Sequence, residues 1–184
     1  MIFKQKASGH TKPILVITIL LLVLFLAGCG PKTERSSYPG DDGATFTFID
    51  DIGRKVTMKR PERIVSLAPS STEILFALGL GDKVVGVDDY SDYPAEAAKI
   101  AKVGGYDKPS LEKIIALKPD LVLADSIHEE EVKKLEELEV PVAVVSPKDL
   151  EGVLNSVRWV GIVTGVRDQA AELEAELALR IRLV

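Results

Sequence analysis

RIVSLAPSSTEILFALGLGDKVVGVDD, residues 63–89, is the stretch that decides the fold class. It holds two short and continuous apolar runs, residues 64–67 and 84–87, which is the pattern of strands buried on both faces. The segment between them, 71–79, repeats its apolar residues at helical spacing. The order strand, helix, strand predicts a parallel sheet that helices cover.

The same alternation continues toward the C-terminus. Further strands are predicted at 102–104, 121–124 and 141–145, and further helices at about 94–100, at 110–117 and in a charged segment that ends near Leu138. A helix over 149–164 is then broken by Gly165, and another begins at 167. We therefore predict an α/β fold, a mostly parallel sheet with helices on both faces.

The first 28 residues are predicted to be an export signal rather than part of the fold. Three lysines precede an apolar run at 14–26, whose helix would reach only about 20 Å and is too short to cross a bilayer. The run ends Leu26-Ala27-Gly28-Cys29, which resembles the lipobox of bacterial lipoproteins. That resemblance implies cleavage before Cys29 and its lipidation. The alternative is an N-terminal anchor helix with an incidental cysteine.

The rest of the chain divides by composition. Residues 29–43 are a polar tether rich in Gly, Pro and Ser, residues 44–165 form the α/β lobe, and residues 166–184 begin a last helix. Inside the lobe, a β-hairpin is predicted first, with strands at 45–49 and 54–58 around a turn.

Composition excludes several classes of function. The net charge is −5 and no basic block occurs, so nucleic acid is not an expected partner. One cysteine rules out a disulfide framework and a cysteine zinc site, and two histidines leave little for a histidine-rich metal site. We expect no metal, no cofactor and no enzyme. His128 begins a run of glutamates that we interpret as the solvated face of a charged helix.

Four serines mark predicted helix starts. Ser70 and Ser126 each precede a glutamate by three residues, as in a capping box, and Ser110 and Ser146 precede other helices. Each lies soon after the carboxyl end of a strand, and this is the edge of a parallel sheet where ligands bind. Ser70 and its neighbour Ser71 are therefore candidate ligand contacts.

Three tyrosines fall in the same set of loops. Tyr90, Tyr93 and Tyr106 account for much of the small aromatic content, which is 5% of the chain. Together they predict a rim for a large, partly apolar ligand. The structural alternative is that Tyr90 and Tyr106 pack on their own loops.

Three segments in order, 63–75, 90–94 (YSDYP) and 111–122 (LEKIIALKPDLV), resemble the N-terminal lobe of a known family. That family is the vitamin B12 and iron-siderophore substrate-binding proteins of ABC importers, and the resemblance runs from about Phe46 to the end. It implies two α/β lobes joined by one long rigid helix, with the ligand between them. It further implies that Tyr90 touches a corrin, that Tyr106 is a second ligand-contacting aromatic, and that Glu112 docks on arginines of the permease.

The resemblance implies a membrane-anchored, extracytoplasmic protein on the cell surface or periplasmic side, which binds cobalamin, haem or a ferric siderophore and docks on ABC permease subunits. Residues 166–184 would then be the start of the linker helix, with the second lobe missing, either through truncation or because a lone lobe pairs with something else. Three alternatives stay open: a docking module alone, a metal-ion-binding lipoprotein, and a hydrolase whose only base would be His128. For Glu112 the alternative is a first-turn acid that favours the helix dipole.

Overall fold

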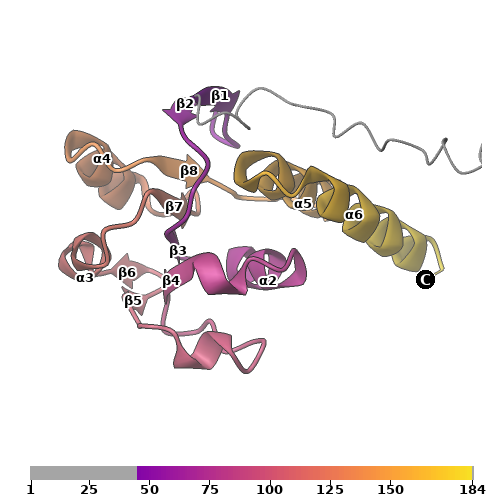
Figure 1. Ribbon diagram of the computed structural model, residues 1–184, viewed down its shortest axis with the longest axis horizontal. Helices are drawn as coiled ribbons and strands as arrows, with labels where there is room; N and C mark the ends of the chain where they lie inside the picture. Colours follow the sequence, from indigo (N-terminus) through magenta and orange to yellow (C-terminus); the bar gives the residue numbers. More distant parts are fainter. Residues whose placement is uncertain (1–44, 184) are drawn as a thin grey trace, which may run out of the picture. The chain divides into compact units, whose positions relative to one another are not determined.

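The structure is a computed structural model that describes residues 45–183 (Figure 1). All described residues belong to one compact unit, Tyr38–Val184. Its strands are β1 (Phe46–Ile49), β2 (Lys55–Met58), β3 (Ile64–Ser66), β4 (Val84–Val87), β5 (Gly104–Gly105), β6 (Lys108–Pro109), β7 (Leu121–Ala124) and β8 (Val142–Val144). Its helices are α2 (Pro69–Ala77), α3 (Leu111–Ala116), α4 (Glu129–Glu137), α5 (Leu150–Thr164) and α6 (Arg167–Arg182), with short 3-10 turns η1 (Gly81–Lys83) and η2 (Ala97–Lys99).

Four parallel strands form the central sheet in the order β4-β3-β7-β8. Alternate residues of a strand point to opposite faces, so Ile64 and Leu121 join one apolar cluster while Val65 and Val122 join another. All four side chains are fully buried, which explains why the strands read as continuous apolar runs. The predicted α/β class with a mostly parallel sheet is confirmed.

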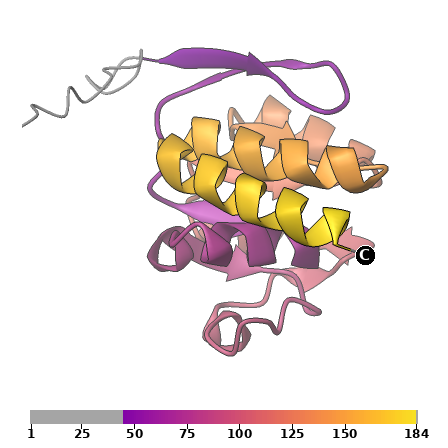
Figure 2. The same ribbon diagram turned by 90° about the vertical axis from the view of Figure 1, so that its right-hand side faces the viewer.

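Helices cover both faces of this sheet. On one face α2, α5 and α6 contribute Leu75, Val160 and Ala170, and on the other α3 and α4 contribute Ile114 and Leu135. Figure 2 shows α5 and α6 side by side across their face of the sheet. Each fully buried aliphatic side chain contributes about 1.5–3 kcal/mol to folding, so these two layers carry most of the stability.

The predicted β-hairpin is present as β1 and β2, which pair antiparallel. The buried carboxylate of Asp50 holds its turn by accepting hydrogen bonds from the Arg54 backbone N–H (2.8 Å) and from the Arg54 guanidinium (2.7 Å). Gly53 supplies the positive φ of 82° that this turn requires. The hairpin is therefore stabilised by the polar contacts of its turn more than by its short strands.

The turn of the hairpin also binds the outer edge of β8. The Val144 N–H donates to Asp50 Oδ2 (3.1 Å), and the Val144 carbonyl accepts from the Asp51 N–H (3.2 Å). The Ser146 N–H donates to Asp51 Oδ2 (2.7 Å). Two aspartates that the sequence placed in a simple turn thus attach the hairpin to the sheet.

The two helices predicted for the end of the chain are present as α5 and α6, and they pack against each other. Gly165 ends α5 with a φ of 81°, as a C-terminal glycine does. The two helices approach closely where Gly161 faces Ala170, because a Cβ on Gly161 would lie 2.1 Å from the Ala170 Cβ. Beyond this contact Leu179 and Leu183 of the last turns are exposed.

The segment between β4 and α3 differs from the prediction. The helix expected at about 94–100 is reduced to η2, because a segment this short gains too little packing to offset helix nucleation. In place of a strand at 102–104 there is a single bridge between Val87 and Lys102, followed by the small β5–β6 hairpin. Gly104, at φ 119°, permits this hairpin, since a Cβ there would meet backbone atoms at 3.0 Å.

Two of the predicted helix caps are wrong. Helix α2 begins at Pro69, so Ser70 lies in its first turn and Ala68 is the N-cap, with no side-chain hydrogen bond. Proline is favoured at the first helical position, which moves the start ahead of the serine. Helix α4 begins after His128, so Ser126 is not its cap either.

Of the two other serines predicted to begin helices, one does and one does not. Ser110 caps α3 as predicted, and its hydroxyl accepts a hydrogen bond from the Lys113 N–H (3.4 Å). Ser146 begins no helix, because α5 is capped by Asp149, whose carboxylate accepts from the Gly152 N–H (2.7 Å).

Candidate functional site

The strand order identifies the edge of the sheet where a ligand would bind. From β3 the chain crosses to β4 on one side and then returns to β7 on the other side of β3. The direction of the connections therefore reverses between β3 and β7, and ligands of open parallel sheets bind outside the carboxyl ends of the strands at such a point. The loops that leave β3, β4 and β7 at this edge carry the candidate residues.

The loop after β4 is held by a buried polar network. Asp88 is fully buried, and its carboxylate accepts hydrogen bonds from the Tyr90 N–H (2.8 Å) and from the Ser91 hydroxyl. The Ser91 hydroxyl lies 2.9 Å from the hydroxyl of Thr72, which in turn donates to the Ser66 hydroxyl (2.9 Å). Since β3, α2 and the loop share this network, the loop is fixed to the sheet.

A lysine closes the same loop from the other side. Lys102 Nζ donates to the carbonyls of Ser91 (2.6 Å) and Asp88 (3.1 Å). The rings of Tyr90 and Tyr93 stand outside this fixed backbone and are 66% and 68% exposed. Two exposed aromatic side chains therefore project from a well-held loop at this edge of the sheet.

Tyr106 lies at the tip of the β5–β6 hairpin and is half-buried. Desolvation raises the pKa of its phenol above the ordinary value of 10.0, and the negative charges of Asp125 and then Asp88 raise this pKa further. Asp125 is the first residue after β7, and Asp88 the first after β4. The structure therefore brings Tyr106 together with the ends of two strands of the sheet.

His128 is buried, and the prediction of a solvated histidine is wrong. It is 0% exposed, its Nδ1 accepts a hydrogen bond from the Asp125 N–H (2.9 Å), and its Nε2 contacts the carbonyl of Tyr106. The rings of His128 and Tyr106 meet edge to face with centroids 5.5 Å apart. The sequence did not indicate this role, because the glutamates that follow His128 are solvated and the histidine was assigned to the same face.

The serine candidates occupy different environments. Ser70 is exposed in the first turn of α2, at the carboxyl end of β3. Ser71 is fully buried, and its hydroxyl has no hydrogen-bond partner among the described residues. Ser70 is therefore accessible at the predicted edge, whereas Ser71 lies beneath it.

Glu112 is exposed in the first turn of α3, the helix that Ser110 caps. An acid there is favoured by the helix dipole by about 0.3–1 kcal/mol. No salt bridge of Glu112 is found within residues 45–183, so its carboxylate is available at the surface. Cys29, the predicted site of lipidation, lies outside the described residues.

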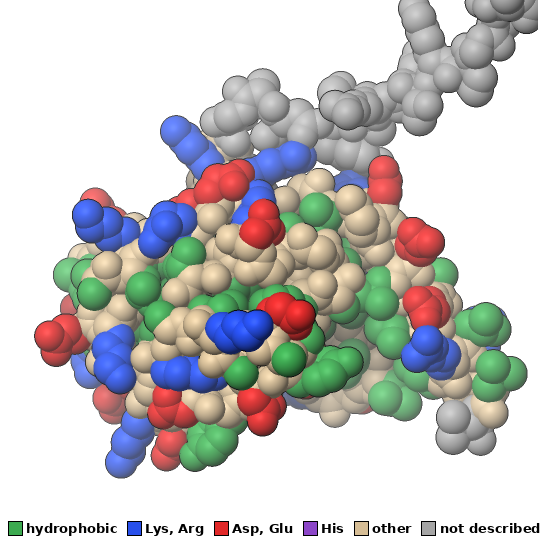
Figure 3. Space-filling model, turned by 60° about the horizontal axis from the view of Figure 1, so that its bottom comes forward, with side chains coloured by type: hydrophobic (Ala, Val, Ile, Leu, Met, Phe, Trp, Pro, Cys, Tyr) green, Lys and Arg blue, Asp and Glu red, His purple; other side chains and the backbone are tan. Residues whose placement is uncertain are grey.

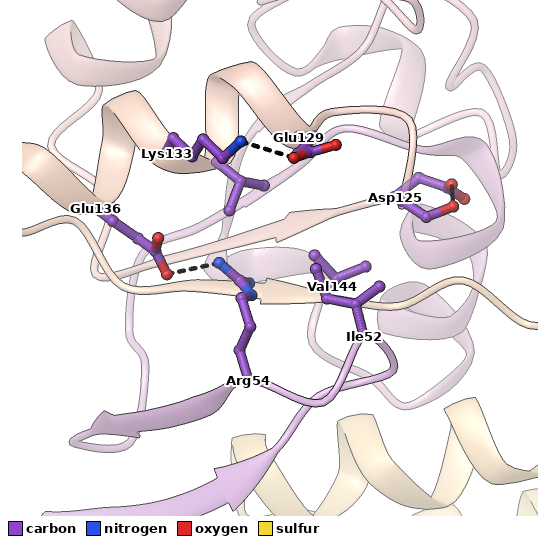
Figure 4. Close-up of a pocket in the computed structure, with 9 residues that line it drawn as sticks. Ile52, Arg54, Asp125, Glu129, Lys133, Glu136 and Val144 are labelled. Carbon is purple, nitrogen blue, oxygen red and sulfur yellow. Dashed lines mark hydrogen bonds and ion pairs between the residues drawn. The ribbon is translucent and has the colours of Figure 1, made fainter.

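A pocket of about 340 Å³ lies between the hairpin turn and α4, close to the end of β7 (Figure 4). Its charged groups bind one another: Arg54 is paired with Glu136 (2.6 Å), and Lys133 with Glu129 (2.6 Å). Val144 contributes to the apolar floor. Because each cation already has its carboxylate, we assign this pocket no ligand.

Three further features bear on function: the distribution of charge on one face of the molecule (Figure 3) and, in the described part of the chain, metal-binding groups and membrane-spanning helices. On the face shown in Figure 3, acidic and basic side chains are interspersed, and neither sign forms a continuous patch. Within residues 45–183 no group of three or more His, Cys, Asp or Glu is arranged to hold a metal ion. In that same part of the chain, no helix is both long and apolar enough to span a membrane.

Three known proteins are similar to this chain. An uncharacterised ABC transporter substrate-binding lipoprotein of Bacillus subtilis, YvrC, is 40% identical over 164 residues, which cover 84% of this chain and 52% of that protein. The periplasmic vitamin B12 binding protein BtuF of Vibrio cholerae superposes with a TM-score of 0.62 at 33% identity, covering 67% of this chain and 49% of that one. A periplasmic haem-binding protein of Pseudomonas aeruginosa gives 0.64 at 31%, covering 66% and 45%.

The chain thus spans about half the length of the relatives that it matches. The family model described as "Periplasmic binding protein" matches residues 64–184, which include the whole parallel sheet and the helices on both of its faces. On this match the chain belongs to the periplasmic binding protein family.

Proposed function

We propose that this chain forms one side of the ligand site of an extracytoplasmic substrate-binding protein that serves an ABC importer, and that the ligand is cobalamin, haem or a ferric siderophore. One observation carries the proposal. Tyr90 and Tyr93 are largely exposed on a loop that a buried network fixes at the carboxyl edge of the sheet. Exposed aromatic rings on rigid backbone bind large planar ligands at a small cost in conformational entropy.

The polar groups beside these rings fit the same class of ligand. Tyr106 and Ser70 are accessible at the same edge, and the carboxylate of Asp125 lies next to the Tyr106 phenol. A site of this kind combines an apolar stacking surface with a few polar groups that fix orientation. Ser71 would contribute only through the packing of α2, since its hydroxyl is buried.

A titration tests the proposal. The chain, and a chimera in which the remaining half is supplied by Bacillus YvrC, are each titrated with cyanocobalamin, haemin and a ferric siderophore by calorimetry. We expect the chimera to bind one of the three with submicromolar affinity and the chain alone to bind it far more weakly, because these 184 residues span only about half the length of the relatives. A folded chimera that binds none of the three contradicts the proposed ligand class. Submicromolar binding by the chain alone contradicts a one-sided site.

We propose further that Glu112 docks this lobe on the permease. Its support is an exposed carboxylate on a capped helix, in the position that the resemblance assigns to docking. Glu112→Gln in the chimera should reduce ligand-stimulated ATP hydrolysis by the transporter and leave ligand affinity unchanged. Glu137→Gln, at another exposed position, is the matched control. Unaltered stimulation by Glu112→Gln would mean that this acid only favours its helix.

We propose finally that Cys29 anchors the protein to the membrane by a lipid and that residues 29–43 are a spacer. The support is the sequence LAGC after a short apolar run and the polar composition that follows it.

A further inference from the structure

We infer that His128 is a positioning residue, which in its neutral Nε2–H form clamps the Tyr106 hairpin to the end of β7. Its consequence for ligand binding rests on the proposed function, whereas its effect on the hairpin does not. Two contacts of one buried imidazole carry the inference: Nδ1 with the Asp125 N–H (2.9 Å), and Nε2 with the Tyr106 carbonyl.

The partners fix the protonation state of the ring. A backbone N–H can only donate, so Nδ1 of His128 must be an acceptor and carries no proton. A carbonyl oxygen can only accept, so Nε2 must carry the proton that it donates to Tyr106. Only the neutral Nε2–H tautomer satisfies both contacts, and the imidazolium form would set two N–H groups against each other at Asp125.

One contact of the His128 ring stabilises the turn between β7 and α4, and the other binds the tip of the β5–β6 hairpin. The His128 N–H donates to the Asp125 carbonyl (3.1 Å) while the His128 ring accepts from the Asp125 N–H, and this reciprocal pair closes the turn between β7 and α4. The β5–β6 hairpin pairs Gly104 with Pro109 and Gly105 with Lys108. That ladder leaves the Tyr106 carbonyl at the tip, where His128 binds it.

Besides His128, the tip of the hairpin is held by the Tyr106 phenol, which lies against the Asp125 carboxylate. Each strand of the hairpin is two residues long, and a hairpin of this size is not stable by itself. The edge-to-face contact of the two rings places the Tyr106 side chain at the same time as its carbonyl is bound. His128 therefore sets the position of one aromatic of the rim without being exposed to a ligand.

Two amide substitutions in the full chain separate the two contacts. In His128→Asn the side-chain oxygen can replace Nδ1 but nothing reaches Tyr106, and in His128→Gln the side-chain amide can replace Nε2 but the acceptor for Asp125 is lost. Lys134→Gln on the exposed side of α4 is the control. Amide hydrogen exchange is followed at residues 104–110 and at Asp125, with β7 as the internal reference.

We expect a crossed result. His128→Asn should speed exchange in 104–110 by about tenfold and spare Asp125, and His128→Gln should do the reverse, each change being that of one lost hydrogen bond. Equal acceleration at both places, or at neither, would overturn the clamp. Nitrogen NMR of the histidine side chain in the wild-type protein gives a test that needs no variant: an Nδ1–H tautomer would overturn it too.

The ligand arm uses cyanocobalamin and haemin as probes on the chimera described above. His128→Asn should weaken whichever probe binds by about three- to tenfold, with Tyr106 intact, and His128→Gln should bind like wild type. Unchanged affinity of His128→Asn would overturn the consequence for binding. A wild-type chimera that binds neither probe contradicts binding of these two ligands, and the exchange result then still decides for or against the clamp.

Discussion

At the scale of single residues, the rim aromatics are placed by buried polar groups beneath them rather than by their own packing. Tyr90 is two-thirds exposed, yet its backbone N–H is bound by a carboxylate that no solvent reaches. Contact with a ligand and support of the loop are thus divided between different side chains. Substitutions can therefore separate binding from stability.

Tyr90→Ala should weaken ligand binding by the chimera by about 1–3 kcal/mol, since an aromatic anchor loses its packing. The melting temperature should stay close to that of wild type because the ring covers no core. Ser91→Ala is the matched contrast: it removes a hydroxyl from the buried network and should lower the unfolding free energy by about 1–3 kcal/mol. Calorimetry and urea denaturation of both variants give the two readouts. If Tyr90→Ala unfolds the loop instead, the ring is structural.

Tyr106 should ionise above pH 10, and its titration can be followed by ultraviolet absorbance in Asp125→Asn against wild type. Desolvation and the carboxylate both disfavour the phenolate in the folded state, so the Tyr106 pKa should fall when the carboxylate is removed. The folded-state pKa is raised, so the folded protein holds the proton more tightly than the unfolded chain does. This contribution to stability is present below pH 10 and is lost as the pH rises through the folded pKa. If the Tyr106 pKa is the same in Asp125→Asn as in wild type, the Asp125 carboxylate does not act on the phenol.

At this scale the sequence indicated where Tyr90 lies but not how its loop is held. Tyr90 follows a strand whose apolar run is readable, whereas Tyr106 lies on a hairpin that the sequence did not predict. Nothing local marks His128 as buried, since its two partners are backbone groups, one of them 22 residues away. A backbone partner does not depend on which amino acid supplies it, so such a contact cannot be predicted from residue types.

At the scale of elements, buried strands and their helices were predictable because burial on both faces demands a continuous apolar run. Strand β7 has the predicted bounds, and α3 has the predicted cap at Ser110. The β5–β6 hairpin was missed because Gly104, Gly105 and Pro109 show no alternation of apolar and polar residues. Its existence depends on backbone conformation and on a tertiary contact, neither of which has a period in the sequence.

The contact between α5 and α6 gives a prediction for a pair of elements. Gly161→Ala should lower the unfolding free energy by about 1–3 kcal/mol, because the new Cβ would overlap that of Ala170 and the helices must separate. Adding Ala170→Gly removes the opposing methyl group and should recover part of the loss. Urea denaturation of both variants measures the effect. If Gly161→Ala and the double variant Gly161→Ala/Ala170→Gly have the same unfolding free energy, the two helices do not meet at this point.

At the scale of the whole molecule, we expect Cys29→Ser to release the protein from the membrane or leave it with its signal attached. The reason is that a serine cannot carry the thioether-linked lipid that the LAGC sequence predicts. Fractionation of cells and the mass of the intact protein check this. A variant that stays in the membrane fraction with normal processing and mass would contradict the lipid anchor, and Ser36→Ala in the tether is the control.

The attachment of the hairpin turn to β8 has a consequence for how this protein avoids aggregation. β8 is an outer strand, and an outer strand with free N–H and C=O groups invites another chain to add to it. Asp50 and Asp51 occupy the groups of Val144 that an incoming strand would use, and the Ser146 N–H as well. The two aspartates therefore protect the edge of β8 from pairing with another chain. This protection requires the hairpin to form early in folding. Contacts within a few residues of sequence form quickly, and the hairpin is built from such contacts.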